Sequence, residues 1–334
     1  MVSSLDVAKL AGVSQATVSR VLNNSPKVTE KTKKKIYAAI DELGYYPNLI
    51  ARSLVTNENR TIALISGAIN NDFYVETTES IVKKANELGY SVIVYFAEEN
   101  QPINIFDSIK GSNVSGILLS SIFLEDSLLG ELEKSGIPYI FFNRRPTKGG
   151  NYVVLDNKKA SYLNAKHLIE LGHTRIAYIS NEFSNISTLY ERKLGFDKAM
   201  RKYHLDNEKY TRVIDGTEEN LKRTIDELIH LKIPPTSIIC TTDHMAMISM
   251  DYLISKGIQI PEDISLTGFD NNKITAHQAI QLTTVSHNEK YNIGRIAAEN
   301  LFEMIENPTK ENGNNIQIVL EPKLFKRSTT GKGK

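Results

Sequence analysis

The sequence predicts a small all-α domain followed by an α/β core of two doubly wound parallel-sheet subdomains. Residues 3–46 contain three short segments with apolar side chains at helical spacing, separated by turn-forming residues. From Thr61 onward, short apolar runs alternate with helical segments, which is the pattern of parallel sheets covered by helices on both faces. This alternation continues to about residue 330, more chain than one doubly wound sheet usually needs.

The first expected helix covers about residues 5–11. Ser4 is its expected N-cap, because a serine hydroxyl can accept a hydrogen bond from a free N–H of the first turn. Its apolar face is expected to consist of Leu5, Ala8 and Leu10. Gly12 follows, and a glycine tolerates the positive φ of a tight turn.

The second helix is expected to begin after Ser14 and to run to about Asn23, with Val18, Val21 and Leu22 on its buried face. The third is expected to begin after Thr29 and to end at Gly44. Two short helices joined by a glycine turn, with a third behind them, match the helix-turn-helix signature.

The net charge of +1 hides an asymmetry between the two parts of the chain. Residues 1–60 contain nine Lys and Arg against five Asp and Glu, so the remaining residues carry a small negative balance. A basic surplus of this size fits a solvated helix face, and it also fits an electrostatic footprint for phosphates.

Residues 47–60 predict a hinge between the two domains. Pro47 ends the preceding helical pattern, and Asn48 can cap a short helix over residues 49–54. A polar linker, residues 56–60, follows. Because the helix spans less than two turns, it needs a partner to form.

The core is expected to span residues 61–330. Its strands are predicted in the runs TIALIS, YSVIVYF, GILLSS, PYIFFN, RIAYIS, SIICTT and ISLTGF. Its helices are predicted over residues 75–88, 158–171, 189–203, 218–231 and 244–256. Ligands of open parallel sheets bind beyond the carboxyl ends of the strands, so we expect a ligand in the cleft between the two subdomains.

Several functional classes are disfavoured by the sequence. It has no apolar run long enough to span a membrane, and its N-terminus lacks the pattern of a secretory signal. A single cysteine, Cys240, excludes an internal disulfide framework, and a cytoplasmic location is expected. The phosphate-loop motifs, the nucleophile elbow GxSxG and the zinc motif HExxH are absent, so we expect no enzyme, no cofactor and no metal site.

The sequence resembles the lactose-repressor family of bacterial transcription regulators along nearly its whole length. The N-terminal match is LDVAKLAGVSQATVSRVLNN, VTEKTKKKI and AIDELGYYPNLIARSL in order. In the core, the matching stretches are LIELGHTRIAYIS, IICTTDHMA, PEDISLTGFDNN and LTTVSHNEKYNIGRIAAENL. The resemblance implies a core similar to periplasmic binding proteins. Its first subdomain would comprise about residues 61–158 and 289–317, and its second about residues 159–287 and 318–327.

The resemblance implies that the second helix enters the major groove of operator DNA. Short side chains at its start allow close approach to base edges, and glutamine can read adenine. Gln15 and Ala16 occupy the positions that set operator sequence, and Arg20 matches a base-reading arginine. Other contacts, mainly to phosphates, are expected from Ser14, Thr17, Ser19, Asn23, Thr29, Thr32 and Tyr45. Simple capping or exposure of Thr17 and Ser19 remains the alternative.

The hinge resembles the family's minor-groove helix. There, paired helices of two subunits insert a leucine between base steps and kink the DNA. Leu54 is the matching residue, Ala51 allows close approach, and Asn48 and Arg52 supply polar contacts.

For the effector cleft, the resemblance points to residues that follow predicted strands. Arg192 matches an effector-binding arginine, and Asp270 matches an acid that accepts from two vicinal hydroxyls. Thr242 matches a polar contact position, whereas Asp243 is better interpreted as a helix N-cap. The remaining expected effector contacts are Asp72, Phe73, Asn143, Arg144 and His287, the last with a structural role as its alternative.

The resulting hypothesis is a homodimeric repressor of carbohydrate-utilisation genes that binds a pseudo-palindromic operator. A sugar or sugar phosphate in the cleft would control its affinity for that operator. The lack of a leucine-heptad tail predicts a dimer rather than a tetramer. The alternative is a catabolite-control regulator whose co-repressor is a phosphorylated carrier protein. The chain lacks tryptophan and has Asn143 where relatives often carry aspartate, so the effector's identity stays open.

Overall fold

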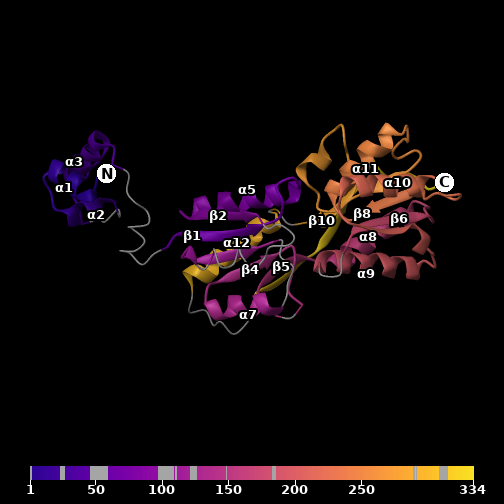
Figure 1. The fold of residues 1–334 in the computed structure, drawn as a ribbon, viewed down its shortest axis with the longest axis horizontal. Helices are drawn as coiled ribbons and strands as arrows, with labels where there is room; N and C mark the ends of the chain where they lie inside the picture. The colour runs from indigo at the N-terminus through magenta and orange to yellow at the C-terminus, as the bar shows by residue number, and fades with distance from the viewer. Residues whose placement is uncertain are drawn as a thin grey trace. The chain divides into compact units, whose positions relative to one another are not determined.

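A computed structural model describes residues 2–22, 27–45, 59–96, 109, 111–120, 126–147, 149–182, 186–288, 290, 292–307 and 315–334. The chain divides into two compact units, Met1–Asn59 and Arg60–Lys334. The first unit contains three described helices, and the second contains the α/β core (Figure 1).

The first unit consists of α1 (Ser4–Ala11), α2 (Gln15–Leu22) and α3 (Glu30–Leu43). The predicted end of the third helix is confirmed, because Thr29 caps its start and Gly44 adopts a left-handed conformation at its end. These helices enclose a small core of Val7, Ala8, Ala11, Val18, Val21, Ile36 and Ala39.

Two expectations for α1 were wrong. Its N-cap is Ser3 rather than Ser4, because Asp6 completes a capping box by accepting the backbone N–H of Ser3. Leu5 and Leu10 are 47% and 45% exposed, so they do not form the buried face. The helix turns its small residues inward instead, which lets the three helices approach closely.

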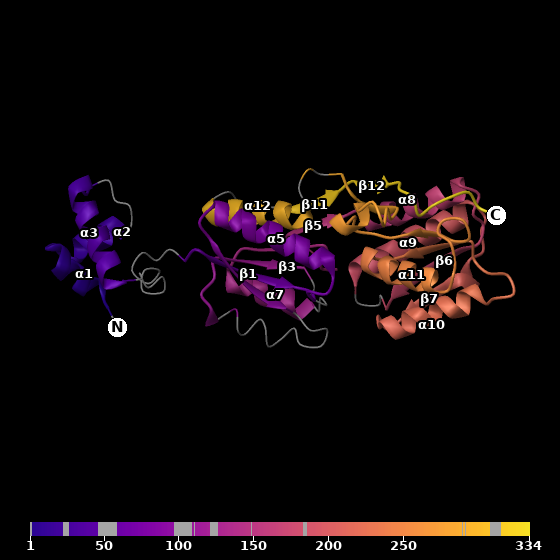
Figure 2. The same ribbon diagram turned by 90° about the horizontal axis from the view of Figure 1, so that it is seen from above.

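The first subdomain of the core is built on a six-stranded parallel sheet with the strand order β11-β5-β4-β3-β1-β2. Its strands are β1 (Thr61–Ser66), β2 (Ser91–Phe96), β3 (Gly116–Leu119), β4 (Tyr139–Phe142), β5 (Tyr152–Leu155) and β11 (Gln317–Leu320). Helices α5 (Asp72–Glu87) and α12 (Ile293–Glu306) cover one face, and α7 (Asp126–Ser135) lies on the other. Figures 1 and 2 show this layering.

The second subdomain has a four-stranded parallel sheet with the order β7-β6-β8-β9. Its strands are β6 (Ile176–Asn181), β7 (Thr211–Ile214), β8 (Ser237–Cys240) and β9 (Ser265–Thr267), with short 3-10 turns at Glu208–Tyr210 and Lys273–Ala276. Helices α8 (Asn157–Glu170) and α9 (Ser187–Lys202) pack on one face of this sheet. Helices α10 (Glu218–Ile229) and α11 (Asp243–Ser255) pack on the other.

The chain crosses between the subdomains three times. It passes from β5 to α8, returns from β10 (Thr284–His287) to α12, and passes again from β11 to β12 (Pro322–Phe325). Strands β10 and β12 pair antiparallel in the crossover. Because β11 extends the first sheet to Leu320, the last crossing comes after that residue and later than the expected boundary at residue 317.

The predicted alternation of strands and helices matches the observed elements, but the predicted runs cover only seven of the twelve described strands. Strands β7 and β11 lie at sheet edges and have partly exposed side chains, so neither appears as a continuous apolar run. Strand β5 is a fully buried apolar run that was overlooked, and β10 and β12 form the crossover pair, whose sequences are not continuously apolar.

Helices α8 and α9 pack so closely that Gly195 cannot carry a side chain. A Cβ at Gly195 would lie 2.1 Å from the carbonyl oxygen of Lys158. We predict that Gly195→Ala lowers the free energy of unfolding by about 2–3 kcal/mol, because the two helices must separate. Urea denaturation measures the change.

Gly130→Ala is the matched control, because Gly130 is also helical but its Cβ would meet no atom within 4 Å among the described residues. This control is expected to be neutral or slightly stabilising. Equal free energies of unfolding for the two variants would contradict the prediction.

Candidate functional site

The cleft between the subdomains contains a cavity of about 290 Å³. Its walls come from both sheets, because the loops after the strands meet there. The first subdomain contributes Phe73 and Glu76 from α5 and Asn143 after β4, and the second contributes Arg192 from α9. The loop after β9 and the crossover strand β10 complete the walls with Asp270, Asn271, Asn272, Ser286 and His287.

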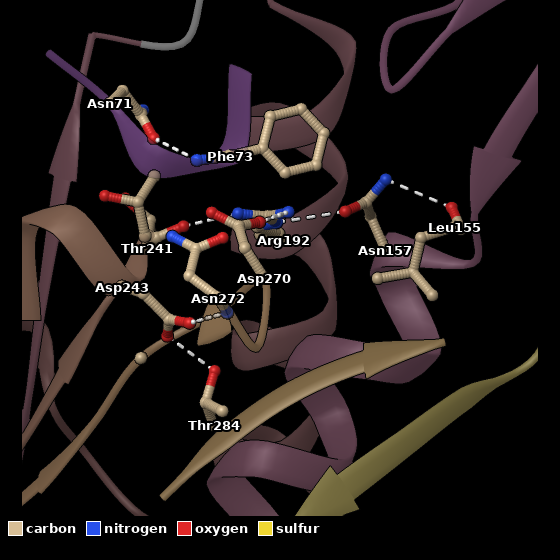
Figure 3. A network of polar contacts seen from close by, with 12 residues as sticks. Asn71, Phe73, Leu155, Asn157, Arg192, Thr241, Asp243, Asp270, Asn272 and Thr284 are labelled. Carbon is tan, nitrogen blue, oxygen red and sulfur yellow. Dashed lines mark hydrogen bonds and ion pairs between the residues drawn. The ribbon is translucent and has the colours of Figure 1, made fainter. Parts of the chain in front are cut away.

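Arg192 is the central polar group of this site. It is 4% exposed, and its guanidinium lies 4.5 Å from the centre of the Phe269 ring. Nε donates to Asn157 Oδ1 at 2.9 Å, Nη2 donates to Asp270 Oδ1 at 3.1 Å, and Nη1 donates to the carbonyl oxygen of Thr241. Figure 3 shows this fork between α8, β8 and the loop after β9. One buried cation therefore connects three parts of the second subdomain.

Asp270 lies in a strained loop. Its φ is 108° and that of Asn271 is 57°, values in the region that favours glycine. Burial raises the pKa of Asp270 to about 6, although the neighbouring Arg192 opposes that rise. Arg192 donates to Oδ1 of this carboxylate, and Asp270 is among the residues that line the cavity.

Asp243 fixes the position of this loop through hydrogen bonds from inside the second subdomain. It is fully buried, and its carboxylate accepts hydrogen bonds from Thr284 Oγ1 at 2.5 Å and from the backbone N–H of Asn272 at 3.0 Å (Figure 3). A Cβ at Gly268 would lie 2.3 Å from Asp243 Oδ1, so glycine is required there. Burial and the nearby Asp270 raise the pKa of Asp243 well above its ordinary value.

The interpretation of Asp243 as an N-cap was wrong. Thr242 is the N-cap of α11, because its hydroxyl accepts from the backbone N–H of Met245 at 3.1 Å. Asp243 is the first helical residue, and its side chain is directed into the protein. The two adjacent polar residues thus have roles that the sequence order alone does not distinguish.

Five of the eight expected effector contacts line the cavity together. They are Phe73, Asn143, Arg192, Asp270 and His287. The other three, Asp72, Arg144 and Thr242, are not among the residues that line it. Asp72 instead begins α5, where Asn71 Oδ1 caps the helix by accepting from the N–H of Phe73.

Sequence reasoning missed several polar residues of the cavity. Asn271 and Asn272 directly follow Asp270 in the stretch FDNN, so their position after a strand was an available signal. Glu76 lies inside α5, where nothing in the sequence separates it from an exposed helix residue. Asn157, which carries no signal of its own in the sequence, is the first residue of α8 and accepts a hydrogen bond from Arg192.

In the first unit, the exposed face of α2 carries the residues expected to read DNA. Gln15, Ala16, Ser19 and Arg20 are exposed, whereas Val18 and Val21 are fully buried. Ser14 Oγ accepts from the backbone N–H of Thr17 at 3.2 Å and contacts its hydroxyl at 2.8 Å. Gln15 Nε2 donates to Ser4 Oγ at 2.9 Å, so its amide rests against α1.

The other expected DNA contacts have structural partners or lie outside the described residues. Thr29 and Thr32 cap α3 together, with 3.0 Å between their hydroxyl oxygens, and Tyr45 packs on the small core. The remaining expected contacts, Asn23, Asn48, Ala51, Arg52 and Leu54, fall outside the described ranges.

The described residues contain no group of three or more His, Cys, Asp or Glu side chains placed to hold a metal ion. None of the helices described combines the length and apolar character needed to cross a bilayer.

Comparison with known proteins gives the family. Residues 5–48 match the family described as bacterial regulatory proteins, lacI family, and residues 165–330 match a periplasmic binding protein-like domain. Over 339 residues the chain is 32% identical to the HTH-type transcriptional repressor PurR of Aliivibrio fischeri, with 98% of each chain covered. The chain belongs to the lacI family. Another lacI-family relative, the repressor PurR of Vibrio vulnificus, is 33% identical over 99% of each chain.

Solved structures of lacI-family proteins share the fold. A Lac repressor dimer bound to operator and the anti-inducer ONPF has a TM-score of 0.84 at 25% identity, with 99% of each chain covered. A complex of the transcriptional regulator CelR with cellobiose has a TM-score of 0.69 at 27% identity, covering 98% of this chain and 100% of CelR. As a lacI-family member, the chain is a DNA-binding transcriptional repressor rather than an enzyme.

The raised pKa of Asp270 predicts a pH-dependent stability. Because the folded state keeps this proton up to about pH 6 and the unfolded chain loses it near 3.8, unfolding becomes easier as pH rises between these values. Asp270→Asn removes this titration. We expect the unfolding free energy of the variant, relative to the unsubstituted chain, to rise by about 2 kcal/mol from pH 4 to pH 6.

Denaturant unfolding at several pH values checks this. Asp215→Asn is the control, because hydrogen bonds from the backbone and hydroxyl of Thr217 lower the pKa of Asp215. The ionised Asp215 carboxylate stabilises the folded state at neutral pH, and this stabilisation is lost only as pH falls below the ordinary aspartate pKa of 3.8. A constant difference for Asp270→Asn across pH 4–6 would refute the prediction.

Proposed function

We propose that this repressor works as a homodimer on a pseudo-palindromic operator and that a small, uncharged, polyhydroxylated molecule in the cleft sets its operator affinity. Genes of carbohydrate use are the proposed targets. A ligand shifts such an equilibrium only if it binds the two states of the repressor with different affinity. The cleft suits this purpose, because its walls come from two subdomains, so a ligand there can favour one arrangement of the two over another.

The observation that carries the proposal is the saturation of Arg192. Its guanidinium already donates to Asn157, Thr241 and Asp270, so the buried positive charge is matched within the protein. A phosphate or carboxylate would have to compete with Asp270 and would leave that carboxylate buried without its partner, at high cost. Sugar hydroxyls can instead donate to the Asp270 carboxylate without breaking the ion pair, because a carboxylate accepts several hydrogen bonds.

The remaining walls favour the same class of ligand. Side-chain amides of Asn143, Asn271 and Asn272 line the cavity, and each amide can both donate and accept hydrogen bonds. Phe73 and Phe325 supply ring faces and edges against which the apolar side of a sugar ring can pack. The CelR complex with cellobiose provides a relative with a sugar bound on the same fold.

The DNA-binding part of the proposal depends on α2. Its small, exposed residues allow the helix backbone to approach the floor of the major groove. Gln15 and Ala16 are proposed to select bases and Arg20 to reach guanine. The two hydroxyls of Ser14 and Thr17 are proposed to contact phosphates, which fix the register without reading sequence. A second copy of the chain would present the same helix to the second half-site.

A thermal-shift screen of the full chain tests the effector class. The panel contains neutral mono- and disaccharides, the corresponding sugar phosphates, and purine bases and nucleosides. We expect at least one neutral sugar to raise the melting temperature, because a ligand that binds only the folded state stabilises it. Its phosphate ester should have little effect. Stabilisation only by phosphates or by a purine base would contradict the proposed class.

Selection from random duplex DNA, followed by binding measurements at physiological salt, tests the sequence readers. We expect a palindromic consensus, and we expect Gln15→Ala and Arg20→Ala each to cost about 1–3 kcal/mol of specific binding. Lys34→Ala on the exposed side of α3 is the comparison, expected to weaken specific and random DNA equally. Equal losses on both kinds of DNA for Gln15→Ala would remove it from the sequence readers.

A further inference from the structure

Two sets of contacts join the two subdomains at opposite edges of the cleft. At one edge, the backbone N–H of Lys273 donates to Glu76 Oε1 at 2.7 Å, and Lys273 Nζ pairs with Glu79 Oε2 at 3.0 Å. At the other, the backbone N–H of Arg145 donates to Ser187 Oγ at 3.1 Å, and its Nε donates to Glu191 Oε1 at 3.1 Å. Each set connects one subdomain to the other across the cavity.

We propose that Glu76 is a further effector-contacting residue, whose carboxylate is shared between the ligand and the backbone of Lys273 and so couples occupancy of the cavity to closure of the cleft. This inference rests on the proposed effector site. It adds a residue from the first subdomain to Arg192 and Asp270, which both belong to the second.

The position of Glu76 supports both of its contacts. Its side chain lines the cavity and is half-buried, and the contact with Lys273 uses only Oε1. Oε2 is therefore the oxygen that a ligand hydroxyl can reach. Burial raises the pKa of Glu76, while the N–H and the charge of Lys273 act against that rise. A hydrogen-bond donor on a ligand would further favour the charged form.

The backbone that carries Glu76 is firmly held. Asn292, the N-cap of α12, donates to the carbonyl oxygen of Glu76 at 3.0 Å and to Ser80 Oγ at 2.7 Å. A Cβ at Gly294 would lie 2.8 Å from the carbonyl oxygen of Thr77, so α5 and α12 are in direct backbone contact there. Movement of Glu76 therefore requires movement of the whole first subdomain.

The contacts of Lys273 contribute little to cleft closure without a ligand. The side chains of Lys273 and Glu79 are 72% and 65% exposed, and exposed ion pairs contribute little. The contacts at the opposite edge are better shielded from solvent, since the side chain of Glu191, which pairs with Arg145, is 11% exposed. The contacts of Lys273 are thus the more exposed of the two sets, and a ligand that donates to Glu76 would shift the population toward the closed form.

The experiment compares three substitutions in the full chain. Lys273→Pro removes the backbone N–H that donates to Glu76. Proline is tolerated at this position, because Lys273 is the first residue of a helical turn. Asn272 already has the extended conformation that a residue before proline prefers, with φ −57° and ψ 148°. Lys273→Ala is the matched control, because it removes only the exposed ion pair. Glu76→Gln keeps an acceptor for Lys273 but replaces the other oxygen with a donor.

Two readouts are used. Fluorescence energy transfer between dyes at Lys83→Cys and Glu219→Cys reports cleft closure; both sites are exposed, and the native Cys240 is fully buried. Labelled subunits are diluted into unlabelled ones so that transfer stays within one chain. Calorimetry with the neutral sugar that gives the largest thermal shift reports affinity, with cellobiose as the starting probe.

We expect Lys273→Pro to lower the closed fraction without any ligand and to weaken sugar binding about tenfold. Glu76→Gln should weaken binding similarly while leaving closure without ligand unchanged, and Lys273→Ala should change neither by more than about twofold. If sugar binds all three variants as it binds the unsubstituted chain, the inference fails while the proposed function stands. If no sugar in the panel binds, the proposed function fails, and an unchanged closed fraction in Lys273→Pro would also overturn the inference.

Discussion

The buried guanidinium of Arg192 determines how the second subdomain is assembled. A charge removed from water needs partners on every side, because an unpaired ion in a protein interior is strongly unfavourable. Arg192 finds them in Asn157 at the start of α8, in the backbone after β8, and in Asp270 after β9. The stacked ring of Phe269 covers its face. The parts of the second subdomain that face the cavity are therefore joined by a single side chain.

The strained loop after β9 is the counterpart of that cation. Asp270 and Asn271 occupy left-handed conformations that cost about 1–3 kcal/mol each, and such conformations persist only where the surroundings enforce them. Here Asp243, in the first turn of α11, holds the loop by accepting the backbone N–H of Asn272, and Gly268 leaves room for the Asp243 carboxylate. Two buried carboxyl groups lie on either side of the loop, so the loop combines backbone strain with electrostatic strain. This is a common arrangement for a segment whose task is to respond to a ligand.

The sequence was sufficient to predict the elements that have strong periodicity and clear ends. The alternating order of the core follows from fully buried strands such as Thr61–Ser66, and the caps at Thr29 and Gly44 follow from local chemistry. Arg192 and Asp270 were predicted from the family resemblance, and the structure brings them together. Thr242 and Asp243 show the limit of this reasoning, because Asp243 is directed inward by distant partners, Thr284 and Asn272. Ser3 was an overlooked local signal, since Asp6 completes its capping box only three residues later.

Glu76 and Asn157 were not predictable for a different reason. Each is an ordinary polar residue within a helix, and its role arises only because a distant part of the chain is brought beside it. The same applies to Leu5 and Leu10, whose burial depends on where α3 packs rather than on the spacing within α1. Contacts between elements that are far apart in sequence thus account for most of what sequence reasoning missed.

The two sides of α2 also have a consequence for evolution. Val18 and Val21 are fully buried and stabilise the small domain, whereas Gln15, Ala16, Ser19 and Arg20 lie on its exposed surface. Substitutions on the exposed side leave the packing of the domain intact, and most surface changes alter stability by less than about 0.5 kcal/mol. On the proposed role of these residues in reading the operator, a duplicated copy of this repressor can acquire a new target sequence by a few changes, without first having to regain a stable fold.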